Sequence, residues 1–264
     1  MFPDLPASLV ATREGEVAVL RLARPEKRNA LDDATVAGIG HFFEALPDWT
    51  AAVVLHGEGA HFCAGLDLSM LAEARAAEAM QHSRLWHSAF DRIALGRVPV
   101  IAALHGAVVG GGLELAAAAH LRIAEAGTYF ALPEGSRGIF VGGGGAVRLP
   151  KLIGTARMLD MMLTGRSYGA EEAVAIGFAQ YTAPAGGGLA HAMMLARRVA
   201  QNAPMTNFAL IHALPRIADA DPATGLLLEA LMSAVAQDAP EAKRRLRDFL
   251  EKRAPKTTHD GGAT

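Results

Sequence analysis

Cysteine is almost missing from this chain of 264 residues, because Cys63 is the only one. A single thiol excludes an intramolecular disulfide and any zinc site built from several cysteines, and it fits a reducing compartment. The first residues also lack the basic segment and apolar run of a secretory signal. These two absences predict a cytoplasmic protein.

An excess of charge of either sign is also lacking. The chain has 25 Lys and Arg residues against 27 Asp and Glu residues, a formal net charge of -2. Such a balance argues against general nucleic-acid binding, while a small basic patch for an anionic ligand is still allowed. Hydrophobic residues make up 51% of the chain, enough for a sizeable buried core. The composition therefore favours a folded globular protein with small-molecule partners.

Several familiar catalytic motifs are missing as well. The four glycines at 142–145 are not followed by the Lys-Ser/Thr pair of a Walker loop, and Val147 takes the place of the last glycine of GxGxxG. Neither the GxSxG elbow of hydrolases nor the HExxH zinc motif occurs. His61, His105 and His120 lack companions at metal-ligand spacing, so structural roles are favoured for all three and no metal is expected.

One long apolar run does occur, at residues 98–124, and its length would suffice to cross a bilayer. The run contains Glu114 and Arg122 and is interrupted by three glycines at 110–112. Charges at mid-span are costly in a membrane. We therefore interpret the run as a buried strand, a turn and a buried helix, and expect no membrane partner.

Strand-like and helix-like segments alternate along residues 1–202, which predicts the α/β class. Strands are expected at Glu16 to Leu22, Ala51 to His56, Val100 to Leu104, Tyr129 to Leu132 and near Phe178 to Tyr181. Helices are expected after a cap at Asp32 or Asp33, at Leu71 to Leu95, Leu113 to His120, Pro150 to Thr164 and Ala170 to Ile176, and in the segment that ends at Ala200.

Residues 203–255 have helical periodicity and no strand signal. The first of two apolar stripes consists of Leu226, Leu227, Leu231 and Val235, and the second of Leu246, Phe249 and Leu250. Because such stripes need a partner surface, we expect an all-helical oligomerisation region. Asp238 and Glu241 predict a capping box that opens the last helix. Residues 256–264 are expected to form a disordered tail.

The stretch from Leu104 to Arg148 is the most informative, because it places Glu114 and Glu134 in largely apolar surroundings beside glycines. An isolated ionised carboxylate is costly there unless it is paired, hydrogen-bonded or protonated. Two carboxylates facing one site do not both ionise easily, so one can hold a proton while the other accepts one. Taken singly, Glu114 also fits a helix start and Glu134 a surface turn. The glycines at 142–145 are interpreted as a loop beside Glu134 without assigned chemistry.

Exposed backbone amides are a second candidate feature. The three glycines at 110–112 precede a predicted helix, whose free N-terminal amides stabilise an oxygen that gains negative charge, and Gly111 is the expected donor. The loop from Cys63 to Leu68 is the other place where glycine leaves backbone exposed. Two such amides aimed at a thioester oxygen would contribute about 3 kcal/mol each to an enolate-like state. A plain tight turn explains the three glycines equally well on these grounds.

Five segments occur in an order and spacing that resemble the enoyl-CoA hydratase/isomerase (crotonase) superfamily over nearly the whole chain. They are RPEKRNAL at 24–31, HFCAGLDL at 61–68, HGAVVGGGLEL at 105–115, PEG at 133–135 and RLPKLIG at 148–154. The resemblance implies a crotonase-like spiral of repeated β-β-α units over residues 1–202 and a helical trimerisation region over 203–255. The implied assembly is a homotrimer or a dimer of trimers.

The resemblance also implies roles for particular residues. It places two oxyanion amides on Leu66 and Gly111 and the two hydratase glutamates on Glu114 and Glu134. The implied reaction is syn addition of water to a 2-enoyl-CoA, in which Glu114 activates water for attack at C3 and Glu134 protonates C2. Coenzyme A (CoA) is part of this substrate, so no separate cofactor is expected.

Contacts to CoA follow from the same resemblance. The implied contacts along the CoA path are Ala64, Leu66, Asp67, Leu68 and Gly111, with Lys27 or Arg28 at the CoA phosphates. Residues 129–148, together with GFAQY at 177–181 and MTNFAL at 205–210, further resemble a subgroup that includes methylthioacryloyl-CoA hydratase. A Δ3,Δ2-enoyl-CoA isomerase and a non-catalytic acyl-CoA-binding scaffold stay open as alternatives. Two carboxylates in an apolar pocket argue against the scaffold.

Overall fold

The computed structural model describes residues 1–70 and 75–251 and divides the chain into two compact units, Met1–Gln201 and Asn202–Thr264. Each unit is described by itself below. The tail expected at 256–264 lies outside the described residues, as do residues 71–74 at the start of the helix expected from Leu71. Within the described residues, no helix has the length and apolar character needed to cross a membrane.

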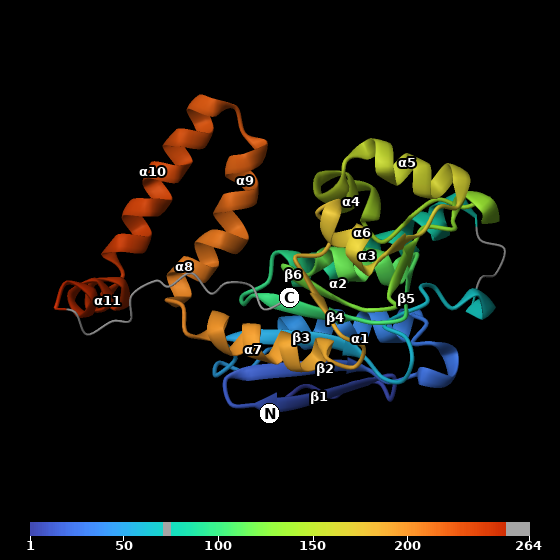
Figure 1. Cartoon of the computed structure of the whole chain (residues 1–264), viewed down its shortest axis with the longest axis horizontal. Coiled ribbons are helices and arrows are strands. Elements are labelled where there is room, and N and C mark those ends of the chain that lie inside the picture. The colour runs from blue at the N-terminus through green and yellow to red at the C-terminus, as the bar shows by residue number, and fades with distance from the viewer. Residues whose placement is uncertain (71–74, 252–264) are drawn as a thin grey trace. The chain divides into compact units, whose positions relative to one another are not determined.

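The first unit is built on a six-stranded sheet with the order β1-β2-β3-β4-β6-β9 (Figure 1). The strands are β1 (Leu9–Glu14), β2 (Val17–Leu22), β3 (Ala52–Gly57), β4 (Val100–Leu104), β6 (Leu121–Glu125) and β9 (Tyr181–Ala183). The β1-β2 pair is antiparallel, and the other neighbours pair in parallel. The mixed α/β class predicted from the sequence is confirmed.

Helices cover both faces of this sheet, which is why its parallel strands are almost wholly apolar. The helices of the first unit are α1 (Asp33–Glu44), α2 (Ala76–Ala94), α3 (Gly111–Ala118), α4 (Gly145–Ile153), α5 (Thr155–Thr164), α6 (Ala170–Ala175) and α7 (Gly188–Ala200). On one face, Val54 clusters with Leu195 of α7. On the other, Leu55 belongs to the larger core with Ile39 of α1 and Phe90 of α2. Successive residues of β3 thus point to opposite layers.

A smaller sheet with the order β5-β7-β8 contains the two strands that precede Glu114 and Glu134 in the sequence. It consists of β5 (Ala107–Val109), β7 (Tyr129–Ala131) and β8 (Tyr168–Gly169). Because β5 and β7 are parallel, the chain leaves both strands at the same edge of the sheet. After β5 it enters α3, which carries Glu114, and after β7 it reaches Glu134. The pairing of two short strands therefore brings these carboxylates together.

Two expectations about local structure in the first unit are wrong. The segment from Pro150 to Thr164 is not one helix, because Gly154, with φ of 82°, ends α4 and precedes α5. The strand expected near Phe178 begins only at Tyr181. The amides of Phe178 and Ala179 both donate to the Ala173 carbonyl and so extend the turn that closes α6.

The second unit consists of helices joined by short turns, as the sequence predicts. Its elements are α8 (Pro204–Phe208), a π-helical segment (Ala209–Ala213), α9 (Leu214–Asp219), α10 (Pro222–Asp238) and α11 (Pro240–Leu250). The predicted capping box is wrong, because Asp238 is the last residue of α10 and its carboxylate binds Lys243 instead. Both apolar stripes are exposed in this unit, and the subunit partner expected for them stays a prediction.

Candidate active site

The turn between β5 and α3 requires glycine at its first position. Gly110 has φ of 55°, a left-handed conformation that glycine adopts without strain. A methyl group there would also lie 2.6 Å from Oε1 of Glu134. The amide of Gly110 donates to the Ala131 carbonyl at the end of β7 over 2.9 Å. This turn therefore fixes the start of α3 directly against Glu134.

The loop after β3 lies alongside the same turn. Cys63 and Val109 are linked because the Val109 amide donates to the Cys63 carbonyl over 3.0 Å. A methyl group on Gly111 would lie 3.5 Å from the Leu66 nitrogen, so the two amides proposed as oxyanion donors are neighbours. Neither the Leu66 amide nor the Gly111 amide donates to another residue within the described part of the chain. Both amides are therefore available to a ligand oxygen.

Glu114 is held by the four-glycine loop. Its Oε1 accepts hydrogen bonds from the amides of Gly143 and Gly145, over 2.8 and 2.7 Å. Only 3% of Glu114 is exposed, and burial raises the pKa of its carboxyl above the ordinary value. The glycine amides and the charge of Arg148 oppose that rise. The interpretation of 142–145 as a loop without chemistry is wrong, because its amides bind a candidate catalytic carboxylate.

Glu134 has a poorer set of partners. It precedes a short 3-10 turn (Gly135–Arg137), is buried, and has an Oε2 atom without a hydrogen-bond partner within the described residues. Burial raises the pKa of the Glu134 carboxyl and a hydrogen bond from its own backbone amide lowers it, while the adjacent Glu114 charge raises it and Arg137 lowers it. A surface turn, the alternative considered for Glu134, is excluded by this burial.

One cavity of about 480 Å³ collects these groups. The site residues expected from the sequence that line it are Ala64, Leu66, Leu68, Gly111, Glu114 and Glu134. Glu114, Glu134 and two unpartnered amides around one cavity can move protons at one atom while stabilising negative charge on another. That combination is what acid/base chemistry beside a thioester carbonyl requires.

Three residues expected to contact CoA are not in the lining of this cavity. Asp67 is buried, and its carboxylate binds Arg24 over 3.0 Å and accepts from the Ser69 hydroxyl over 2.6 Å. Its side chain therefore does not line this cavity, and the contact with CoA expected for Asp67 stays a prediction. Lys27 and Arg28 are exposed on a 3-10 turn before α1, and their contact with CoA phosphates stays a prediction.

Helix α2 supplies a wall of the cavity that sequence reasoning missed. His82, Ser83 and Trp86 all line it. The Trp86 ring occupies the space beside Gly111, because a methyl group on that glycine would lie 2.6 Å from the ring. The only signal in the sequence is their helical spacing, which any amphipathic helix shares.

With this geometry in place, the comparison with known proteins is decisive. The pattern of the enoyl-CoA hydratase/isomerase family matches residues 12–260. The chain therefore belongs to this family and is an enzyme of the crotonase superfamily, as the five sequence segments indicated.

Individual relatives agree with this assignment over most of their length. A crystal structure from Rhodopseudomonas palustris, provisionally named an enoyl-CoA hydratase, is 58% identical with a TM-score of 0.92 and covers 96% of this chain and 98% of its own. The short-chain-enoyl-CoA hydratase of Clostridium acetobutylicum is 30% identical over 93% of this chain and 95% of its own. A structure from Thermobifida fusca, also provisionally named an enoyl-CoA hydratase and in complex with CoA, is 26% identical, has a TM-score of 0.82 and covers 90% of this chain and 95% of its own.

Proposed function

We propose that this enzyme adds water across the 2,3 double bond of a 2-enoyl-CoA thioester to give a 3-hydroxyacyl-CoA. The observation that carries the proposal is the presence of Glu114, Glu134 and the free amides of Leu66 and Gly111 around one cavity. An isomerase that moves one proton needs only one acid/base group at a time, whereas hydration must both deprotonate water and deliver a proton to carbon.

The hydrogen bonds suggest which glutamate does what. Two amide donors favour the ionised form of Glu114, so it acts as the base that takes a proton from water as the oxygen bonds to C3. Glu134 has one oxygen, Oε2, without a hydrogen-bond partner within the described residues and lies beside the Glu114 charge, and both features favour the protonated form that delivers a proton to C2. The amides of Leu66 and Gly111 bind the thioester oxygen while it carries enolate charge. A proton returned from Glu114 to Glu134 completes the cycle.

CoA as the carrier of the acyl group follows from the family and from the CoA-bound relative. In this proposal Ala64, Leu66 and Leu68 border the path of the pantetheine arm, and no separate cofactor takes part. We also propose that the exposed stripes of the second unit form subunit contacts in a homotrimer or a dimer of trimers. Light scattering would test the assembly.

The proposed reaction is tested by loss of the enoyl absorbance of crotonyl-CoA. We expect Glu114→Gln and Glu134→Gln each to lower kcat by about 10²- to 10⁴-fold, the usual contribution of one general acid or base. Turnover at the wild-type rate by both variants would contradict the proposed mechanism. A panel that includes methylthioacryloyl-CoA and a 3-enoyl-CoA separates a specialised hydratase from an isomerase, because only an isomerase would turn over the 3-enoyl substrate without adding water.

A further inference from the structure

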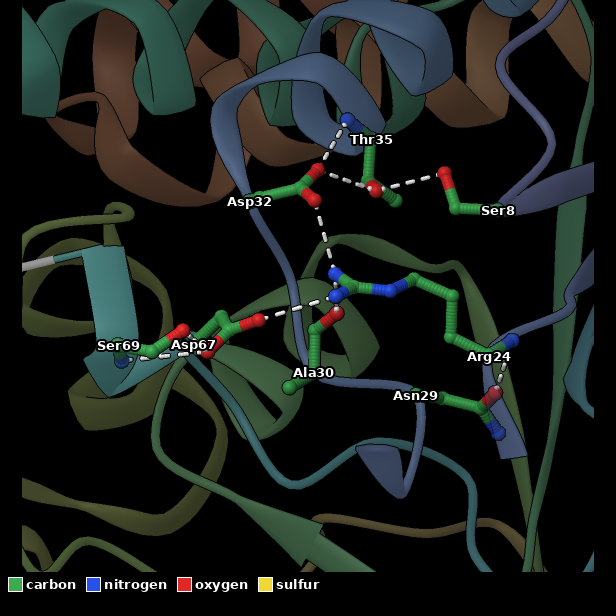
Figure 2. Close-up of polar contacts among 8 residues, drawn as sticks. All are labelled: Ser8, Arg24, Asn29, Ala30, Asp32, Thr35, Asp67 and Ser69. Carbon is green, nitrogen blue, oxygen red and sulfur yellow. Dashed lines mark hydrogen bonds and ion pairs between the residues drawn. The ribbon is translucent and has the colours of Figure 1, made fainter. Parts of the chain in front are cut away.

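Arg24 ties together two chain segments, one that contains Ala30 and Asp32 and one that contains Asp67 (Figure 2). Its Nη1 donates to the Ala30 carbonyl over 3.1 Å and to the Asp32 carboxylate over 2.8 Å. Its Nη2 donates to the Asp67 carboxylate over 3.0 Å. One guanidinium therefore holds the segment that leads into α1 and the loop that carries the Leu66 amide.

The backbone places Leu66 between two hydrogen bonds to a single residue. The Leu31 amide donates to the Gly65 carbonyl over 2.8 Å, and the Asp67 amide donates to the Leu31 carbonyl over 2.9 Å. The peptide groups on both sides of Leu66 are thus fixed by Leu31, and its own amide is left free toward the cavity. Any shift between the two segments would change the direction of that amide.

The main chain of Arg24 is also held in place, by the side chain of Asn29. Asn29 Oδ1 accepts from the Arg24 amide over 2.9 Å, and Asn29 Nδ2 donates to the carbonyls of Glu58 and His61 over 2.9 and 2.8 Å. The planar fork of arginine suits a site where three acceptors must be held at once. Arg24 itself does not line the cavity.

Removing the guanidinium would take away the cation that Asp32 and Asp67 share and leave Lys27 and the Ser69 hydrogen bonds as the other favourable interactions of the Asp67 carboxylate. The side chains in these two ion pairs are 9% to 24% exposed, so solvent screens them only partly. Repulsion between the carboxylates would then separate the segments that the guanidinium joins. The first group affected would be the Leu66 amide, which lies between Gly65 and Asp67.

The geometry points to Arg24 as a positioning residue for the oxyanion site, acting on the Leu66 amide through Asp67 and the 30–32 segment. The inference rests on the proposed function, since it assigns that amide to the thioester oxygen. An amide that is out of line stabilises the transition state less while the ground-state contacts to CoA are kept. Loss of Arg24 should therefore appear in kcat rather than in KM.

The test compares Arg24→Met with Arg166→Met in the full-length enzyme. Arg166 is a matched control because it also bridges two carboxylates, Asp160 and Glu172, over 3.4 and 3.3 Å, and does not line the cavity. We expect kcat for crotonyl-CoA to fall at least about tenfold in Arg24→Met, part of the 10²- to 10³-fold cost of losing one oxyanion donor entirely. KM should stay within about twofold. Arg166→Met should match the wild type in both.

A second readout is the absorbance maximum of bound 3-phenyl-2-enoyl-CoA, which moves to longer wavelength when donors polarise its carbonyl. The shift should be smaller in Arg24→Met than in the wild type and unchanged in Arg166→Met. Arg24→Lys, which keeps the charge but not the fork, should fall between the wild type and Arg24→Met in both readouts and covers the case in which Arg24→Met does not fold.

The outcomes separate this inference from the proposed function. If the wild type hydrates enoyl-CoA but both Arg24 variants match Arg166→Met in kcat and in the absorbance shift, the positioning role is wrong and the proposed function stands. If the wild type hydrates no enoyl-CoA, the proposed function fails, and the absorbance shift alone decides whether Arg24 orients the amide.

Discussion

Glu114 and Glu134 line one cavity, but their carboxylates have different hydrogen-bond environments. Glu114 Oε1 accepts two backbone amides from the loop at 142–145, whereas Glu134 Oε2 has no partner within the described residues. Burial raises the pKa of both carboxyls, and only for Glu134 is the neighbouring glutamate an additional cause that raises it.

This difference acts in opposite directions on the two carboxyls, because amide hydrogen bonds oppose the rise in the pKa of Glu114 and the Glu114 charge adds to the rise in the pKa of Glu134. A carboxylate that accepts amide hydrogen bonds is stabilised in its charged form, and a buried carboxyl next to a negative charge is stabilised in its neutral form. The pair is coupled, so its protons leave in two steps that belong to both groups. The proposed assignment of Glu114 as base and Glu134 as acid therefore rests on these backbone donors and on the neighbouring charge, not on the residue type.

The largest change in the environment of Glu114 is expected from substitution of Gly145, whose amide donates to its carboxylate. A methyl group on Gly145 would lie 2.8 Å from both Cγ and Oε1 of Glu114, so Gly145→Ala should displace the carboxylate and weaken its hydrogen bond with the amide of residue 145. We expect kcat for hydration to fall by about 10²-fold, the scale of a misplacement near 1 Å. Steady-state assays with crotonyl-CoA measure this.

The control for that substitution is Gly169→Ala. Gly169 has an ordinary extended backbone, and a methyl group there would lie 3.8 Å from its nearest neighbour, Oε2 of Glu172. Its kcat should match the wild type. Equal activity of Gly145→Ala and Gly169→Ala would mean that the Glu114 carboxylate does not need the glycine loop.

Both glutamates and both amides could be predicted from the sequence, because charged residues and glycines in apolar surroundings are conspicuous and the five segments resemble a known family. The function of the loop at 142–145 could not. Its donors are main-chain amides, which every residue except proline carries. They lie about thirty residues from Glu114 in the sequence and contact it only in the folded chain. Only the fold brings them together.

Other parts of the fold were missed for related reasons. The strands β1, β5, β6 and β8 were not predicted. Half of β1 is exposed, β8 has only two residues, and β5 and nearly all of β6 lie inside the apolar run at 98–124, where periodicity does not separate strand from helix. The family resemblance placed Asp67 on the CoA path together with Leu66 and Leu68, which line the cavity, whereas Asp67 does not. Alternation along an extended segment turns its side chain to the opposite side, toward Arg24.

A smaller effect should appear in the pH dependence of stability. Because the pKa of Glu134 is raised in the folded state, the folded protein binds more protons than the unfolded chain above the ordinary value of 4.5. Stability contributed by this group is therefore lost as the pH rises from that value through the raised pKa, by at most about 1.4 kcal/mol per pH unit.

The measurement is denaturant unfolding of the wild type and Glu134→Gln between pH 4 and pH 8. The neutral variant should gain stability relative to the wild type as the pH rises, and the difference should level off once Glu134 is ionised. A difference that does not change with pH would show that Glu134 titrates alike in the folded and unfolded states.

The most direct test of which carboxylate is the base and which is the acid is their titration by ¹³C NMR in enzyme labelled at the glutamate carboxyl carbons. Glu114→Gln and Glu134→Gln assign the two signals by their loss. We predict that Glu134 titrates at higher pH than Glu114, and that Glu114→Gln lowers the midpoint of Glu134 by removing the adjacent charge. The reverse order of midpoints, or both midpoints at the ordinary value of 4.5, would contradict the assignment of Glu114 as base and Glu134 as acid.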